Sequence, residues 1–322
     1  MSDGNDRLRL FVASALPSEV NEDLSKEFST AFSSTSHPAS AMQASGVPYD
    51  ALLVSVDVRL DAEEIFRMPR SVGAIATYSV GLDHIDLQAA HDRGVAVFNT
   101  PDVLSDAVAE IGLFLLLGAA RRATEAIGLI RSRKWSGWTA TQLNGVQLAG
   151  KTLGILGMGK IGQKVAKRAQ AFGMRVVYSN LHPLTESLAE DARFYPEFSS
   201  MLGDIDALVL AAPATPQTRG ILNARSLSAA KPGLIVVNIA RGDLVVDDDL
   251  IDALENGTVR AAGLDVFAGE PHVNPRYFDL PNAFMLPHTG SSTIEARRLM
   301  GRALITALND WRQGKIPSNR VI

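Results

Sequence analysis

The sequence predicts an α/β protein with two parallel sheets. Short apolar segments rich in β-branched residues alternate with helical patterns along nearly all of the 322 residues. Strands that alternate with helices indicate parallel sheets that are covered on both faces. A chain of this length exceeds what one hydrophobic core usually serves, which favours two domains.

The expected strands fall into two groups along the chain. They lie at 8–13, 51–56, 73–77 and 95–98 in the first group, and at 152–156, 174–179, 207–211, 234–239 and 259–264 in the second. Between the groups, a long apolar helix is expected over 103–122. It is followed by a polar segment with Trp135 and Trp138 that reads as an excursion from the core. The Ser-, Thr- and Ala-rich segment 29–45 is predicted to be a mobile loop.

The last part of the chain has a helical pattern and no strand of its own. It must therefore pack on another part of the protein, and we assign it to the first domain. The sequence thus predicts a discontinuous domain of residues 1–102 plus 291–322 and a continuous domain of residues 103–290, with a cleft between them.

Composition excludes several kinds of site. The absence of cysteine removes disulfides, thiolate catalysis and cysteine-ligated metals, and it fits a cytoplasmic location. A net charge of -4 gives no positive field for nucleic acid or anionic membranes. The N-terminus shows no secretion signal, and the longest apolar run, 111–120, is about half of the roughly 20 residues of a membrane-spanning helix.

A glycine-rich turn follows the first strand of the second group. Gly157 would make a tight turn, Gly159 would let the backbone approach a pyrophosphate, and Gly162 would allow close packing of helix on strand. The N-terminus of the following helix supplies N–H groups for phosphate. Strand, turn, helix and next strand occur in the order of a Rossmann dinucleotide-binding unit.

The end of the next strand bears on the choice of cofactor. NAD-selective sites usually place an acid here to bind the ribose 2′-OH, but this chain has Ser179, Asn180 and Leu181. The lack of an acid favours NADP(H) over NAD(H), and Asn180 and His182 could donate hydrogen bonds to a 2′-phosphate. An arginine in place of Leu181 would be the better phosphate partner. The alternative that this loop does not discriminate between NADP(H) and NAD(H) therefore stays open.

Charged residues follow three later strands. Arg241, Asp265 and His288 each come after an apolar strand pattern, and Glu270 lies five residues beyond Asp265. Ligands of an open parallel sheet lie beyond the carboxyl ends of its strands. Convergence of a cation, an acid and an imidazole at this edge predicts a catalytic site.

These motifs resemble the D-isomer-specific 2-hydroxyacid dehydrogenases, especially the glyoxylate/hydroxypyruvate reductase branch. The matching stretches are 77–87, 94–110, 148–162, 211–223, 236–254, 261–271 and 286–297. The resemblance implies two Rossmann- or flavodoxin-like domains, a homodimer, and hydride transfer from NAD(P)H to small 2-keto acids that yields D-2-hydroxy acids. No metal is needed for this chemistry.

The resemblance also implies roles for the three charged residues. Arg241 would bind the substrate carboxylate, and His288 would be the general acid that protonates the carbonyl oxygen. Glu270 would hydrogen-bond the imidazole and favour its protonated form.

Further residues are implied around this centre. Backbone groups of Val80 and Gly81 would contact the substrate carboxylate, and Trp138 would help to shape the substrate pocket of a partner subunit or only anchor the dimer. The implied cofactor-binding residues, which include Asp265 facing the nicotinamide carboxamide, are Gly157, Met158, Gly159, Lys160, Ile161, Gly162, Ser179, Asn180, Leu181, Ala212, Pro213, Thr218, Ile239, Ala240, Asp265, His288 and Gly290.

Other functions stay open at this point. The substrate could be hydroxyphenylpyruvate or 2-ketogluconate, and the enzyme could be a phosphoglycerate dehydrogenase, although the stretch 77–87 is poor in basic residues. The chain could also be a dinucleotide-sensing binding protein without catalysis. Thr289, which stands where the branch usually has isoleucine, is a departure from the pattern.

Overall fold

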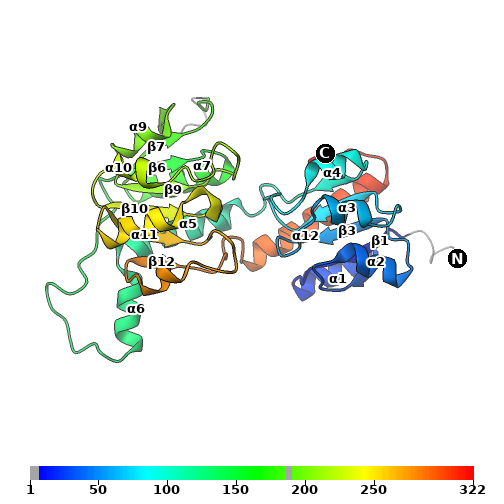
Figure 1. The fold of residues 1–322 in the computed structure, drawn as a ribbon, viewed down its shortest axis with the longest axis horizontal. Coiled ribbons are helices and arrows are strands. Elements are labelled where there is room, and N and C mark those ends of the chain that lie inside the picture. Colours follow the sequence, from blue (N-terminus) through cyan, green and yellow to red (C-terminus); the bar gives the residue numbers. More distant parts are fainter. Residues whose placement is uncertain (1–6, 186–190) are drawn as a thin grey trace. The chain divides into compact units, whose positions relative to one another are not determined.

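Two units make up the chain in a computed structural model that describes residues 7–185 and 191–322 (Figure 1). One unit comprises Met1–Leu104 and Ser291–Ile322, and the other comprises Ser105–Gly290. We call them the five-stranded unit and the seven-stranded unit after their sheets. The first six residues of the N-terminus discussed above lie outside the described part.

The five-stranded unit is built on a wholly parallel sheet. Its strands, in the order β2-β1-β3-β4-β5, are β2 (Ser29–Phe32), β1 (Arg9–Val12), β3 (Ala51–Val54), β4 (Ala74–Thr77) and β5 (Ala96–Phe98). The central strands β3 and β4 are buried along their whole length, because helices cover both faces of the sheet. The order 2-1-3-4-5 is that of flavodoxin-like folds.

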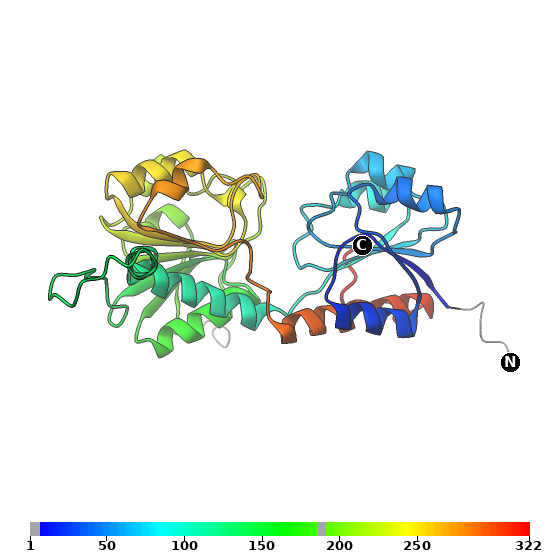
Figure 2. The ribbon, with the colours of Figure 1, turned by 90° about the horizontal axis from the view of Figure 1, so that it is seen from below.

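The helices of this unit divide between the two faces of the sheet, as Figure 2 shows. They are α1 (Ser18–Glu27), α2 (Pro38–Ser45), α3 (Ala62–Arg67), α4 (Leu87–Asp92) and α12 (Ile294–Arg312). The late helix α12 packs on α1 and on β4. Its Trp311 ring lies against Gly73, where a Cβ atom would come within 2.9 Å of the ring, and 6.5 Å from the Phe98 ring. The end of the chain therefore completes the core of the five-stranded unit.

The expectation of a mobile loop over 29–45 is wrong. Residues 29–32 form β2, which pairs in parallel with β1, and residues 38–45 form α2. As an edge strand, β2 has one neighbour and an exposed or half-buried side-chain pattern. Such a strand is held by main-chain hydrogen bonds and needs no apolar run, which is why its sequence resembles a loop.

The seven-stranded unit also has a wholly parallel sheet. In spatial order its strands are β12 (Ala283–Met285), β11 (Val259–Leu264), β10 (Leu234–Asn238), β9 (Ala207–Leu210), β6 (Thr152–Leu156), β7 (Arg175–Ser179) and β8 (Arg193–Tyr195). Counted from β6, the first six strands have the Rossmann order 3-2-1-4-5-6. The order reverses between β6 and β9, where ligands of such sheets bind.

Helices flank this sheet on both faces (Figure 2). They are α5 (Ser105–Ala120), α7 (Lys160–Ala171), α9 (Phe198–Leu202), α10 (Ala224–Ser228) and α11 (Asp247–Glu255), with short 3-10 helices at Gly242–Leu244 and Pro275–Asp279. The apolar α5 packs on α7, β10 and β11. The five strands predicted for this part of the chain are confirmed, and the short edge strand β8 was not predicted.

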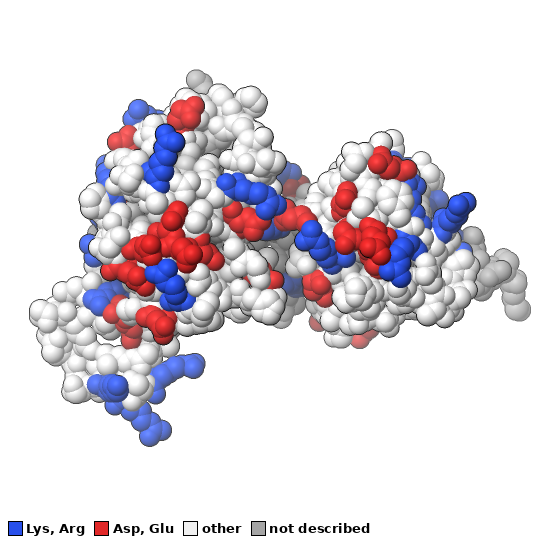
Figure 3. All heavy atoms as spheres, in the orientation of Figure 1, with Lys and Arg blue, Asp and Glu red and all other residues white. Residues whose placement is uncertain are grey.

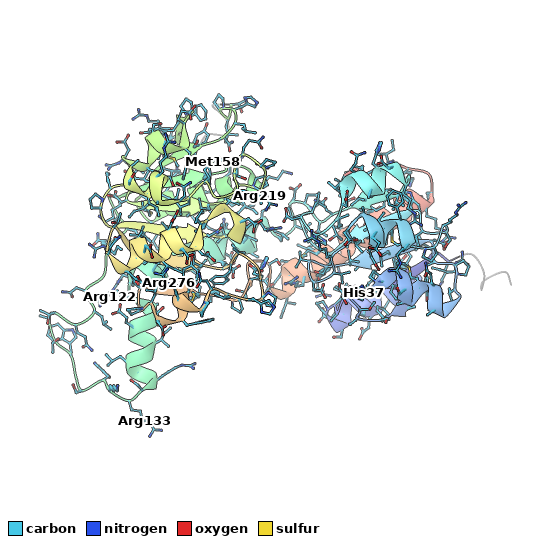
Figure 4. The ribbon with its side chains drawn as sticks, viewed as in Figure 1. His37, Arg122, Arg133, Met158, Arg219 and Arg276 are labelled. Atoms are coloured by element: carbon cyan, nitrogen blue, oxygen red, sulfur yellow. The ribbon has the colours of Figure 1, made fainter. Side chains whose placement is uncertain are left out.

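An extended arm leaves this unit after α5. It consists of α6 (Ala123–Arg131) and the irregular segment 132–147, and Figure 4 shows Arg122 at its base and Arg133 near its far end. No residue of α6 is buried. This is the tryptophan-bearing excursion expected from the sequence.

Charged side chains are spread over the surface. Figure 3 shows acids gathered over α11, where Arg276 pairs with Asp248, Asp252 and Glu255. Within the described residues, no helix is long and apolar enough to cross a membrane.

Candidate active site

The turn after β6 requires glycine at its first position. Gly157 has a φ of 96°, in the left-handed region that side chains disfavour. A Cβ atom there would also lie 2.5 Å from the Ala212 nitrogen. This contact brings the end of β6 against the end of β9, so the turn sits at the point where the strand order reverses.

The next two glycines have different surroundings. A Cβ atom at Gly162 would lie 2.2 Å from the Gly157 carbonyl oxygen, whereas one at Gly159 would meet no atom within 4 Å. Gly159 caps the N-terminus of α7, whose first N–H groups have no partner inside the helix. Open space beside a helix N-terminus fits a pyrophosphate, so these residues suit the dinucleotide that the sequence predicts. Figure 4 labels Met158 on this turn.

Asn180 ties the end of β7 to the glycine turn. Its side-chain oxygen accepts a hydrogen bond of 3.0 Å from the Met158 N–H. An amide whose oxygen is engaged still has its NH2 group as a donor. Leu181 beside it is 89% exposed, and no acid occurs from Ser179 to Thr185.

The predicted residues after β9 and β10 also lie at this edge of the sheet. Thr218 folds the chain after β9 back on itself, because its hydroxyl donates to the Pro213 carbonyl over 2.7 Å. Ile239 and Ala240 follow β10 directly and are nearly buried.

Arg241 stands on a turn that two neighbours shape. Asn238, which is 1% exposed, accepts from the Ala240 N–H and donates to the Arg241 carbonyl. Gly242 packs so closely on the chain after β11 that a Cβ atom would lie 1.8 Å from the Phe267 carbonyl carbon. The turn that carries Arg241 is therefore held against the loop that carries Glu270.

Glu270 and His288 form a direct pair. The His288 Nδ1 and Glu270 Oε2 atoms are 2.7 Å apart, and the other Glu270 oxygen accepts from the Phe267 N–H over 2.7 Å. Burial alone would raise the pKa of Glu270, but the bonds from His288 and Phe267 and the charge of Arg241 outweigh it and lower that pKa. The carboxylate is thus ionised and can only accept, so Nδ1 of His288 carries a proton and Nε2 is left for chemistry.

Asp265 supports the turn that presents His288. Its side chain is buried, with the residue 2% exposed, and its two oxygens accept from the Thr289 and Gly290 N–H groups, each over 2.7 Å. The Asp265 carbonyl also accepts from the His288 N–H. Burial raises the pKa of Asp265, against the opposing effect of these bonds. The bonds hold His288 at its φ of 54°, and the predicted contact with a carboxamide stays a prediction.

Three neighbouring strands therefore carry the predicted catalytic residues. Arg241 follows β10, Glu270 follows β11 and His288 follows β12, and these strands lie side by side. The structure brings the three together at one edge of the sheet, the same edge as the glycine turn. Sequence reasoning missed the two residues that shape the Arg241 turn, Asn238 and Gly242.

Two other predicted groups belong to other parts of the chain. Val80 and Gly81 belong to the five-stranded unit, in the loop that follows β4. Trp138 is on the arm and is 81% exposed. Neither belongs to the cluster of charged residues within the seven-stranded unit.

A Rossmann-ordered sheet, a glycine turn at its reversal point and an acid–imidazole pair at the same edge define a dinucleotide-dependent dehydrogenase. Residues 113–290 match the family model described as "D-isomer specific 2-hydroxyacid dehydrogenase, NAD binding domain". The chain belongs to this family and is an NAD(P)-dependent oxidoreductase.

Individual relatives agree with this assignment. The chain is 46% identical over 253 residues to a glycerate dehydrogenase of Hyphomicrobium methylovorum, which covers 78% of this chain and 79% of the relative. It is 40% identical over 276 residues to a glyoxylate reductase of Thermococcus litoralis, covering 84% and 83%. It resembles the crystal structure of an NADPH-dependent glyoxylate/hydroxypyruvate reductase of Sinorhizobium meliloti with NADP and malonate, with a TM-score of 0.89, 32% identity and coverage of 98% and 97%.

Proposed function

We propose that the protein reduces small 2-keto acids, such as glyoxylate and hydroxypyruvate, to D-2-hydroxy acids, with NADPH preferred to NADH. The observation that carries this proposal is the 2.7 Å pair of Glu270 and His288 beside Arg241, at the ends of three neighbouring strands. The names of the relatives support it, because glycerate, glyoxylate and hydroxypyruvate are all small acids of this type.

In this proposal His288 is the general acid. Glu270 keeps a proton on Nδ1, so the protonated imidazole donates its Nε2 proton to the carbonyl oxygen of the substrate. When bound, the nicotinamide supplies the hydride that the carbonyl carbon accepts. The imidazole is left neutral with Nδ1 protonated, and it regains one proton from solvent in each turnover.

Arg241 supplies the charge that holds the substrate. Its guanidinium is always protonated and offers a planar pair of donors that matches a carboxylate. Its charge also acts on Glu270, where it helps to lower the pKa of that carboxyl. One cation thus stabilises both the bound carboxylate and the ionised partner of His288.

The preference for NADPH rests on the end of β7. No acid stands there to repel a 2′-phosphate, and Asn180 uses its oxygen on the Met158 N–H, so its NH2 group is the part left to bind an anion. The exposed Leu181 contributes no charge to this site.

A homodimer is part of the same proposal. The arm exposes several large apolar side chains close together in the sequence, whereas monomeric proteins usually expose such residues singly. The exposed fractions are 48% for Ile127, 59% for Ile130, 54% for Trp135 and 81% for Trp138. A second copy of the chain would cover them. Sedimentation equilibrium tests this, and a monomer at micromolar concentration would argue against it. A cytoplasmic location stays a prediction from the cysteine-free composition.

The decisive experiment uses His288→Asn, because asparagine tolerates the left-handed backbone at this position. NADPH and NADH are offered in separate reactions with glyoxylate, hydroxypyruvate, phenylpyruvate, hydroxyphenylpyruvate and 2-ketogluconate, and 3-phosphoglycerate with NADP and NAD. We expect fastest oxidation of NADPH with the two smallest keto acids, and a fall in kcat of about 1000-fold in the variant. The matched control, the exposed His91→Asn, should retain full activity.

Each alternative function gives a different result. Binding of NADPH without turnover of any acid would favour the sensing protein, and the His288→Asn variant would then bind NADPH as tightly as the wild type. A preference for a large keto acid or for phosphoglycerate would agree with a dehydrogenase but would contradict the proposed substrate.

A further inference from the structure

The loop that follows β4 has every carbonyl of its first part engaged. We call residues 79–82 the amide loop. The carbonyl oxygens of Ser79, Val80 and Gly81 accept from the Thr100 N–H over 2.9 Å, the Asn99 Nδ2 group over 3.0 Å and the Ser79 hydroxyl over 2.7 Å. All of these partners belong to the five-stranded unit.

This pattern fixes where the N–H groups point. The C=O and N–H of a trans peptide point in opposite directions, so the N–H groups of Val80, Gly81 and Leu82 are directed away from the partners of the preceding carbonyls. Within residues 7–185 and 191–322, none of these three N–H groups donates to a protein acceptor. All three residues are half-buried, so each keeps part of its surface exposed. Successive free N–H groups are a common means of binding an anion.

A series of side-chain hydrogen bonds leads to the Gly81 carbonyl, and the direction of each bond can be assigned. The Ser79 hydroxyl has one proton, and it goes to the Gly81 carbonyl, which can only accept. The Thr77 hydroxyl, 2.7 Å from that of Ser79, must therefore donate to Ser79. Its own acceptor capacity then faces His84, whose Nε2 atom lies 2.9 Å away. Nε2 of His84 accordingly carries a proton, and donors run from His84 through Thr77 and Ser79 to Gly81.

The inner members of this series are shielded from water. Thr77 is fully buried and Ser79 is 6% exposed. Hydrogen bonds in such surroundings have little competition from solvent, and each polarises the next. Removing one hydroxyl would thus release the Gly81 carbonyl instead of exchanging one partner for water.

Asn99 is anchored from the other end of the chain. The Asn319 side chain donates to the Asn99 carbonyl over 2.7 Å, and the Asn99 N–H donates to the Asn319 carbonyl over 3.3 Å. This pairing fixes the backbone from which the Asn99 amide reaches the Val80 carbonyl.

We propose that His84, Thr77, Ser79 and Asn99 are positioning residues that hold the N–H groups of the amide loop in place for the carboxylate of the keto acid. The proposal rests on the function proposed above and names the residues through which the backbone acts. None of the four needs to touch the substrate. Their effect is on the binding of the carboxylate and not on the transfer of the proton or hydride.

Steady-state kinetics test this with a matched pair at Thr77. Ser79→Ala and Thr77→Val should each raise the KM for glyoxylate about three- to ten-fold, the value of one hydrogen bond, with kcat and the KM for NADPH near those of the wild type. Thr77→Ser keeps the hydroxyl and should restore the KM. Unchanged KM in both loss variants, or a fall in kcat that Thr77→Ser shares, would overturn the proposal.

A second measurement separates this inference from the proposed reaction. Amide resonances of Gly81 and Leu82 are followed by NMR while oxalate, an unreactive dicarboxylate, is added to the wild type and to Ser79→Ala. Selective shifts of these resonances in the wild type that need at least three-fold more oxalate in the variant support the positioning role, even if no keto acid is reduced. Absence of any shift in the wild type refutes the anion site. The proposed reaction is then still tested by the reductase assay alone.

Discussion

The two units place different kinds of group at the carboxyl edges of their parallel sheets. The seven-stranded unit places ionisable side chains there, with Arg241, Glu270 and His288 on adjacent strands. The five-stranded unit places main-chain N–H groups there, in a loop whose carbonyls are bonded by a hydroxyl and an amide, with a second hydroxyl and an imidazole behind the first hydroxyl. The comparison teaches that parallel sheets of similar build can offer different chemistry at their carboxyl edges, ionisable side chains in one unit and main-chain dipoles in the other.

Substitution of Glu270 is the strongest test of this difference between the two sheet edges. Glu270→Gln keeps the shape but removes the negative charge beside the imidazole, and we expect kcat to fall about 10- to 100-fold with little change in the KM of the keto acid. Ser79→Ala, in the other unit, should raise the KM of the keto acid with little change in kcat. A rise in KM without a fall in kcat for Glu270→Gln would break the comparison.

Glu270 should also leave a signature in the dependence of stability on pH. Its pKa is lowered in the folded protein, so the ionised carboxylate stabilises the fold above the ordinary pKa of glutamate. That contribution is lost as the pH falls through the lowered value. The difference in Tm between the wild type and Glu270→Gln should be largest near neutral pH and should vanish well below about pH 4. A difference that grows on acidification would contradict the direction of the shift.

The glycine turn sharpens the comparison, because here the seven-stranded unit also acts through its backbone. Gly162→Ala places a methyl group against the Gly157 carbonyl and should lower the free energy of unfolding by about 1 to 3 kcal/mol. Gly159→Ala meets no atom and has an ordinary φ of -74°, so the Tm should be unchanged while NADPH binds about ten-fold more weakly. Thermal denaturation and calorimetric titration give both values. Wild-type affinity in Gly159→Ala would show that phosphate does not approach this residue.

The smallest effect is expected at Asn180. Asn180→Asp can still accept from the Met158 N–H, but it puts a negative charge where the amide NH2 was. The ratio of kcat/KM for NADPH to that for NADH should fall about five-fold, since the charge repels a 2′-phosphate and suits a ribose hydroxyl. Asn180→Gln, without the charge, is the control. An unchanged ratio in the Asp variant would mean that this position does not contact the ribose.

The sequence predicted best what repeats a strong local pattern. Apolar strands followed by glycine or by a charged residue marked the sheet of the seven-stranded unit, and both strand orders confirm the α/β class. The edge strands β2 and β8 were missed, because a short strand that is bonded to one neighbour needs no apolar pattern. Short strands at the edges of sheets are thus the least visible elements of this fold.

Supporting contacts were beyond the sequence for a different reason. Asp265 is predicted to face the cofactor, and nothing in the sequence indicates that its two oxygens also accept from the Thr289 and Gly290 N–H groups in the His288 turn. Gly242 must be glycine because the Phe267 backbone packs against it. The direction of the hydrogen bonds from His84 to Gly81 follows from distances between atoms that only the structure gives. A residue that acts by holding another has no signature of its own in a single sequence.

The position of α12 has a consequence for the order in which the protein is made. All of the seven-stranded unit lies in one continuous stretch, Ser105–Gly290, whereas the five-stranded unit needs residues from both sides of that stretch. Its core lacks Trp311, and its amide loop lacks the Asn319 anchor, until both residues have left the ribosome. Because domains fold as units during synthesis, the seven-stranded unit can fold first, and the five-stranded unit, which begins the chain, is completed last.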